Sequence, residues 1–162
     1  MHRRTSFLIA LIAIVAIVTV DVTSVAGESE EIAVNVTSPA KKEGIEVRNS
    51  LLVKGTAELP PGYHIWVFAR REDFDTDGIW WPQNEGRINS RTGEWRVSAN
   101  FGGPQDVDWY FDVAVAVFDM DAHHELKEWL KDANERKSWE PIPMPEAAAP
   151  PQLFKVHKVD HN

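Results

Sequence analysis

The sequence contains no cysteine among its 162 residues. A disulfide bond, a zinc site with cysteine ligands and a thiol nucleophile are therefore excluded. Many small exported domains depend on disulfide bonds for stability, and this chain cannot. Its stability has to come from a packed hydrophobic core, and the chain is long enough to build one.

Basic residues are scarce relative to acidic ones. The chain has 17 Lys and Arg against 25 Asp and Glu, which gives a net charge of −8. Proteins that bind nucleic acid non-specifically need a basic surface to neutralise phosphates. We therefore expect no nucleic-acid partner.

The longest apolar run lies near the N-terminus and is short for a membrane span. Residues 7–20 are apolar apart from one threonine, about 14 residues where a spanning helix needs about 20. Basic residues precede the run, and small residues follow it up to Ala26. This order is typical of a signal peptide over residues 1–26. We expect an exported protein (secreted, periplasmic or cell-surface) with a single domain over residues 27–162. Retention of the segment as an N-terminal membrane anchor is the alternative.

Hydrophobic residues in the rest of the chain alternate with a period of two, the pattern of β-strands. Strands are expected over residues 32–37, 46–48, 51–57, 64–70, 79–83, 94–101, 111–118 and 153–159. Pro82 is expected to limit the strand 79–83, because proline cannot donate to a ladder. The strands 64–70 and 111–118 carry hydrophobic residues on both faces, so both of their faces should be covered.

One helix is expected before the last strand. Apolar residues follow a helical spacing from Ala122 to Ala133, with Asp121 as the N-cap, and predict an amphipathic helix over about residues 121–134. Ala114 and Ala116 are small and would let this helix pack closely on the strand 111–118. The segment 139–151 holds five prolines, which predicts an irregular, extended conformation.

Several short motifs resemble known exported domains. VTSP (36–39), Gly44, Val47 and LVKGTA (52–57) resemble immunoglobulin-like and fibronectin type III-like modules of exported bacterial proteins. IWVFAR (65–70), WWPQ (80–83), TGEW (92–95) and FGGPQD (101–106) resemble uncharacterised prokaryotic sandwich domains of this type. The resemblance implies a mainly β fold, an immunoglobulin-like antiparallel β-sandwich of about seven to eight strands. It supplies no catalytic residue, and the expected helix departs from the plain immunoglobulin-like pattern.

The loop at residues 73–78 reads D-F-D-T-D-G and carries the strongest metal signal. Carboxylates at alternate positions can converge on calcium, a hard cation, when a glycine allows the sharp turn. The candidate ligands are Asp73, Asp75, Asp77, the backbone carbonyl of Ile79, and Glu85, which lies one residue beyond the usual bidentate position. The alternative is a solvated turn, in which the Asp and Gly residues serve turn geometry alone.

Aromatic residues give a second candidate site. Trp80 and Trp81 are adjacent in an expected strand, so they should point to opposite faces and at most one should lie in the core. Exposed rings can stack on sugars or anchor a protein partner. The candidate binding surface consists of Trp80, Trp81, Trp109 and Tyr110. Core packing is the alternative, and it is the favoured interpretation for Trp66 and Trp95.

The expected helix offers a weaker metal signal. His124 and Glu128 share a helix face at i, i+4 spacing, as two metal ligands could. The spacing indicates no third ligand, so a solvated helix face is favoured. The sequence also has no nucleophile elbow, phosphate-binding loop or dinucleotide fingerprint, and we expect no enzymatic activity.

These observations favour an exported, non-catalytic binding or interaction module of immunoglobulin-like type. Its expected partner is a protein or polysaccharide at the cell exterior, and calcium is the only cofactor suggested. A carbohydrate-binding module that uses surface tryptophans is one alternative, and a carboxylate-dependent hydrolase is another. A retained N-terminal anchor would instead indicate a structural part of an envelope assembly.

Overall fold

The computed structural model describes residues 31–40 and 42–160, except for the side chains of residues 75–77. The expected signal peptide lies outside the described residues. The fold is mainly β. In chain order, the elements are β1 (Ala33–Ser38), β2 (Ile45–Val47), β3 (Ser50–Glu58), β4 (His64–Arg71), the 3-10 helix η1 (Glu72–Asp77), β5 (Ile79–Gly86), β6 (Glu94–Asn100), the 3-10 helix η2 (Pro104–Asp106), β7 (Tyr110–Phe118), α1 (Met120–Arg136), β8 (Ile142–Pro143) and β9 (Gln152–Lys158).

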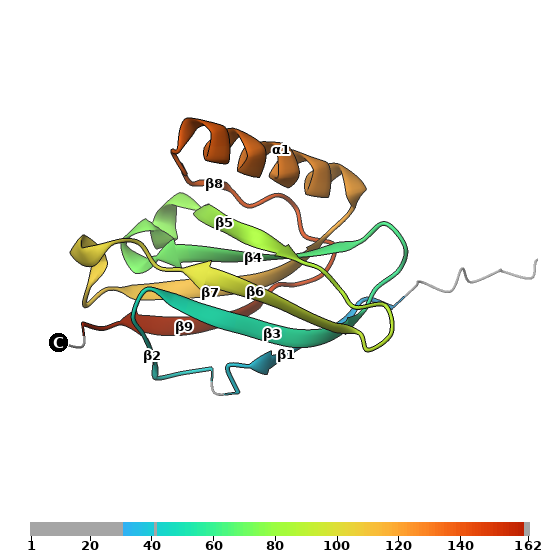
Figure 1. Cartoon of the computed structure of the whole chain (residues 1–162), viewed down its shortest axis with the longest axis horizontal. Coiled ribbons are helices and arrows are strands. Elements are labelled where there is room, and N and C mark those ends of the chain that lie inside the picture. The colour runs from blue at the N-terminus through green and yellow to red at the C-terminus, as the bar shows by residue number, and fades with distance from the viewer. Residues whose placement is uncertain (1–30, 41, 161–162) are drawn as a thin grey trace, which may run out of the picture.

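The strands form two sheets, and α1 adds a third layer (Figure 1). One sheet has three strands in the order β1-β3-β6, and the other has six in the order β2-β9-β7-β4-β5-β8. Their pairings are antiparallel except for β2 with β9, which is parallel. The expected β-sandwich is thus confirmed.

No helix within the described ranges combines the length and the hydropathy that a membrane span requires.

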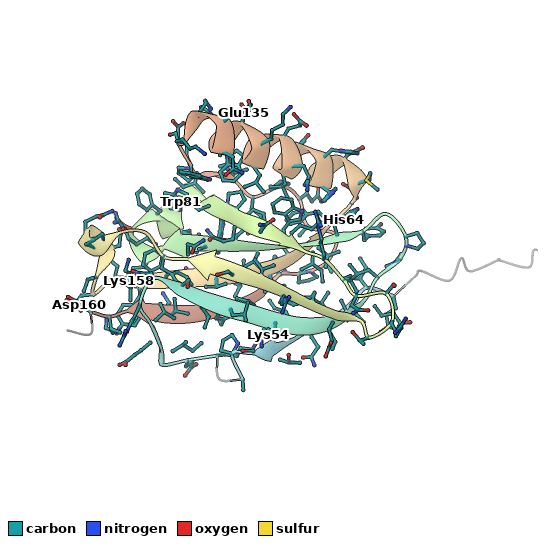
Figure 2. The ribbon with its side chains drawn as sticks, in the orientation of Figure 1. Lys54, His64, Trp81, Glu135, Lys158 and Asp160 are labelled. Carbon is teal, nitrogen blue, oxygen red and sulfur yellow. The ribbon has the colours of Figure 1, made fainter. Side chains whose placement is uncertain are left out.

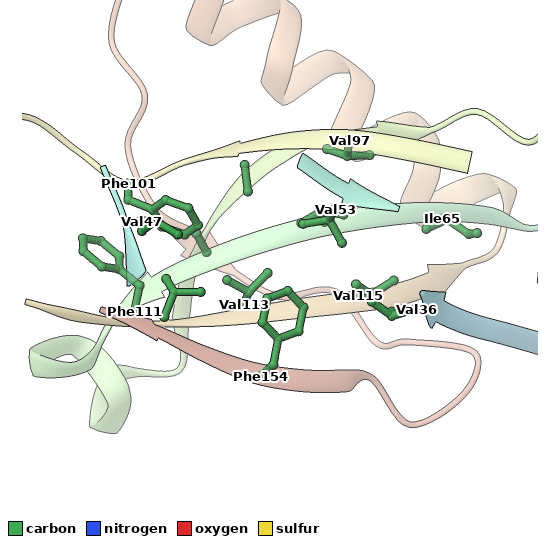
Figure 3. Packing of buried hydrophobic residues seen from close by; sticks show 14 of the residues in the cluster. Val36, Val47, Val53, Ile65, Val97, Phe101, Phe111, Val113, Val115 and Phe154 are labelled. Carbon is green, nitrogen blue, oxygen red and sulfur yellow. The ribbon is translucent and has the colours of Figure 1, made fainter. Parts of the chain in front are cut away.

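The main core lies between the two sheets (Figure 3). From the six-stranded sheet it receives Ile65 and Val67 of β4 and alternate residues of β7, and from the three-stranded sheet Val53 of β3 and Val97 of β6. Phe101 and further aromatic side chains fill one end. The alternation in the sequence therefore predicts correctly which residues of β4 and β7 face the second sheet.

A second core fills the space between the six-stranded sheet and α1. Trp66 and Phe68, on the other face of β4, pack there with Ala114 and Ala116 of β7 and with Leu126 of α1. The expectation that the helix covers the second face of these strands is confirmed. The small side chains on β7 leave room for the two large aromatic rings.

The start of α1 differs from the expectation. The N-cap is Asp119, whose Oδ1 accepts a hydrogen bond from the backbone N–H of Ala122 at 3.0 Å, so the predicted N-cap, Asp121, is wrong. Both aspartates suit a cap by residue type. Asp119 directly follows the last residue of β7, and the helix begins as soon as that strand ends. Asp121 instead lies in the first turn, where its charge suits the helix dipole.

The strand β5 is longer than the expected 79–83, because Pro82 does not limit it. Pro82 is paired with Phe68 and Asn84 with Val67, so Gln83 is an extra residue in a β-bulge. A bulge tolerates a residue that cannot donate to the ladder. The strand therefore continues to Gly86 and carries Glu85 along the sheet.

The buried Lys158 should contribute strongly to stability. Its side chain is 2% exposed, and its Nζ donates to the carbonyls of Phe101 and Gly103 at 2.6 Å each. We expect Lys158→Met to lower the free energy of unfolding by about 2–3 kcal/mol, because one buried and one partly buried carbonyl lose a charged donor. Urea denaturation measures this. Lys54→Met, on the exposed face of β3, serves as control and should cost less than about 0.5 kcal/mol. Equal effects of the two substitutions would contradict the prediction.

Candidate functional site

An open cleft of about 540 Å³ lies at one end of the sandwich. This volume is within the range of about 300–1,000 Å³ that small-molecule sites occupy. The cleft collects residues from the ends of β4, β5 and β6, from η1 and η2, and from the segment after α1. Its lining residues are Ala69, Arg71, Phe74, Trp81, Pro82, Gln83, Asn100, Gly102, Gln105, Asp106, Phe111 and Trp139.

Aromatic residues form much of the apolar part of the cleft, among them Phe74, Trp81 and Trp139. Trp81 is half-buried, and its Nε1 donates to the backbone carbonyl of Trp139 at 3.0 Å. Phe74 meets the Trp81 ring edge-on, with centroids 5.3 Å apart and an interplanar angle of 77°. Trp139 itself is 48% exposed. The Trp81 ring is therefore fixed from two sides while part of it remains accessible to solvent.

Arg71 organises the polar part of the cleft. Its Nε and one terminal nitrogen donate to the two oxygens of Asp73 at 2.7 and 2.8 Å, and its other terminal nitrogen donates to Asp106 at 2.5 Å. The guanidinium also lies over the rings of Trp109, at 4.7 Å, and Phe74, at 5.3 Å. Its hydrogen bond to Asp73 lowers the pKa of that carboxyl. Arg71 thus links η1, η2 and the end of β4.

Asp106 is buried and bonded on both oxygens. Its Oδ2 accepts from the backbone N–H of Gly103 at 2.8 Å and from Nε2 of Gln105 at 3.0 Å. Gly102 has φ +61°, and a Cβ at this position would overlap the Asp106 carboxylate. Only glycine therefore fits here, and it lets the loop close around the carboxylate. Asp106 is the sole carboxylate among the described lining residues.

The charges and amides of the cleft indicate what it can bind. Arg71 is shared between two carboxylates, so this group of three carries a net negative charge, as does the whole chain. An anionic ligand is disfavoured in such surroundings. The side chains of Asn100 and Gln105 are exposed at the rim and supply amide donors and acceptors. The cleft is suited to a neutral polar ligand with an apolar face.

No family model, curated protein or solved structure matches this chain.

The structure separates the four aromatic residues of the expected binding surface. Trp80 lies in the second core, with the Arg70 guanidinium 4.3 Å from its ring centroid. Trp109 is half-buried against Arg71, and Tyr110 is exposed and stacked on His157 at 4.5 Å. Of the four, Trp81 alone lines the cleft. As expected for neighbours in a strand, Trp80 is buried and Trp81 is more accessible.

The candidate ligands of the expected calcium loop that the structure describes have other partners. The loop forms η1, and the left-handed Gly78 (φ +64°) follows it. Both oxygens of Asp73 are bonded to Arg71, and a calcium ion would have to displace that guanidinium. The side chains of Asp75 and Asp77 lie outside the described residues, and the backbone of Ile79 is paired with β8. Calcium binding stays a prediction.

Glu85 is brought to a different group, at the other end of β4. Its Oε1 lies 3.2 Å from Nδ1 of His64, and the His64 ring stacks on that of His123 with centroids 3.6 Å apart. Trp66 donates from Nε1 to Nδ1 of His123 at 3.1 Å. One ligand atom from each of His64, Glu85 and His123 lies within 4.8 Å of the others. Burial, and then the charge of His64, lower the pKa of His123 and favour its neutral form.

The pair His124 and Glu128 does not join this group. Both residues are exposed, and Glu128 pairs with Lys131 at 3.8 Å. The buried histidine is His123, three residues before Leu126 on the stripe that faces the sheet. This i, i+3 relation to a core leucine is the signal that could have identified His123 from the sequence. Nothing local to His64 or Glu85 indicates that they meet it.

Proposed function

We propose that this protein is an exported, non-catalytic binding module of immunoglobulin-like type whose cleft binds a neutral, hydroxyl-rich ligand such as a saccharide chain. The observation that carries the proposal is the cleft with Phe74, Trp81 and Trp139 on its apolar side and exposed amides at its rim. Aromatic rings stack on the apolar faces of sugars, and amides bond to hydroxyl groups. A hollow site favours such a ligand over a flat protein surface.

The strand order supports the immunoglobulin-like part of the proposal. The order β1-β3-β6 corresponds to strands A, B and E of that fold, and β9-β7-β4-β5 corresponds to G, F, C and C′. The chain leaves β1 in the three-stranded sheet and continues as β2, which pairs in parallel with β9 at the edge of the six-stranded sheet. The addition to this plan is α1, inserted between the strands that correspond to F and G. In this frame the cleft lies at the ends of strands, where loops are free to specialise.

The rigidity of the cleft supports a binding role. Arg71 and Asp106 have their hydrogen bonds made within the protein, and Gln83 accepts from the backbone N–H of Asn100 at 2.7 Å. Side chains that are already fixed lose little conformational entropy when a ligand binds. The ligand would then contact the accessible face of Trp81 and the exposed amide groups.

Replacing Trp81 should abolish most of the affinity. We expect Trp81→Ala to weaken binding at least tenfold, about 1.4 kcal/mol, because the substitution removes a large, fixed aromatic surface from the cleft. Isothermal titration with a panel of neutral oligosaccharides, and retention on insoluble polysaccharides, measure the effect. Trp139→Ala should act in the same direction.

Tyr110→Ala is the matched control, because Tyr110 is an exposed aromatic residue outside the cleft. It should leave affinity unchanged, and circular dichroism should show all variants folded. Retention of the wild type that neither tryptophan substitution reduces would sink the proposed site. Absence of binding to every neutral saccharide would reject the ligand class.

A further inference from the structure

The group of His64, Glu85 and His123 joins three separate elements. His64 begins β4, Glu85 lies in β5, and His123 lies in the first turns of α1. Glu85 is paired with Trp66, and His64 precedes Trp66 by two residues, so all of these side chains project toward the helix. Figure 2 shows His64 below α1, well separated from Trp81, which lines the cleft. This site is therefore independent of the proposed saccharide site.

One nitrogen of the group is buried without a partner. Nδ1 of His64 is bonded to Glu85, whereas Nε2 of the same ring is buried and has no hydrogen-bond partner in the part of the chain that the structure describes. Burying an unpaired polar atom is costly, and such atoms in folded proteins call for a specific explanation. A lone pair on a neutral imidazole is a good ligand for a metal ion. Glu85 can itself act as a ligand only if its carboxylate leaves Nδ1 or uses its second oxygen.

We propose that His64, Glu85 and His123 bind a divalent transition metal ion of the zinc type between α1 and the six-stranded sheet. Two imidazoles and one carboxylate are ligands that zinc and its neighbours prefer, whereas calcium and magnesium prefer oxygen ligands alone. Three protein ligands leave a fourth position for water or an incoming group. The ion would cross-link the helix to two strands.

Binding requires a local rearrangement. The two rings stack with an interplanar angle of 11°, so their in-plane lone pairs run nearly parallel. The rings have to turn for one nitrogen of each to point at a common ion, and the ion competes with the Trp66 hydrogen bond to His123. Lys127 also lies 3.7 Å from the Glu85 carboxylate. Removing this positive charge should strengthen metal binding.

The experiment is a zinc titration of the purified, untagged protein after treatment with chelator. Isothermal titration should show one ion per chain, and thermal melting should shift upward with zinc and return with chelator, because the ion binds the native state. His64→Gln and Glu85→Gln should each weaken zinc binding at least tenfold. Lys127→Ala should tighten it severalfold. Calcium at the same concentration should not reproduce the shift.

His124→Asn is the matched control, because it removes the neighbouring exposed histidine and leaves the group intact. It should bind zinc like the wild type. The variants of His64 and Glu85 act at two separate positions, so misfolding of one leaves the other as a test. The proposal is overturned if the wild type binds no zinc, or if a folded His64→Gln or Glu85→Gln variant binds it as tightly as the wild type does. Equal loss in His124→Asn would indicate surface histidines instead.

Discussion

Trp66→Ala should lower the free energy of unfolding by about 3–5 kcal/mol, the range measured for large aromatic truncations in protein cores. Trp66 is fully buried between β4 and α1. Its truncation would leave a cavity beside Phe68 and Leu126, and it would remove the N–H that bonds to His123. Urea denaturation followed by circular dichroism at the helix signal measures the loss. The substitution should therefore loosen the attachment of α1 to the sheet.

Trp66→Phe separates the two contributions. It keeps an aromatic ring in the second core but removes the hydrogen-bond donor and part of the volume, so we expect a smaller loss, about 1–2 kcal/mol. Trp129→Ala, at a half-buried position on α1, should cost less stability than Trp66→Ala. A loss below about 1 kcal/mol for Trp66→Ala would show that α1 is not packed on this ring.

The layered fold could be predicted because two strands are hydrophobic on both faces. The alternation in β4 and β7 requires a second sheet on one side and another cover on the other, and the amphipathic stripe of α1 supplies that cover. The start of α1 and the extent of β5 were less predictable. Asp119 and Asp121 are equivalent as caps by residue type, and the end of β7 decides between them. The bulge at Gln83 depends on the pairing with β4, which the local sequence around Pro82 does not reveal.

The cleft could be predicted only in part, because its residues come from distant segments. The sequence predicts that at most one of Trp80 and Trp81 is buried in one core, since neighbours in a strand point to opposite faces, but not which of them lines a cleft. Arg71 and Asp106 give no such signal, because charged residues are common in this acidic chain and only the fold brings η1 and η2 together. The same holds for the histidine group, whose members lie on three elements.

Arg71→Leu should lower the free energy of unfolding by about 2–3 kcal/mol and weaken ligand binding in the cleft. The substitution leaves the Asp106 side chain, which is 9% exposed, without a positive partner among the described residues. Breaking a fully buried ion pair costs about 3–5 kcal/mol, and the smaller value follows because the Arg71 side chain is 23% exposed. Urea denaturation measures the stability, and titration with the saccharide measures the affinity.

A double-mutant cycle with Asp106→Asn tests the cause. If the pair acts as one unit, the double variant should be more stable than the sum of the single losses predicts, by about 1–2 kcal/mol. Asp73→Asn should cost less than Asp106→Asn, because the Asp73 carboxylate is exposed to solvent while Asp106 also fixes the backbone N–H of Gly103. Additive losses would instead show that Arg71 stabilises the cleft through its contacts with the rings of Phe74 and Trp109. The positions of these two rings would then depend on packing against the flat guanidinium more than on its charge.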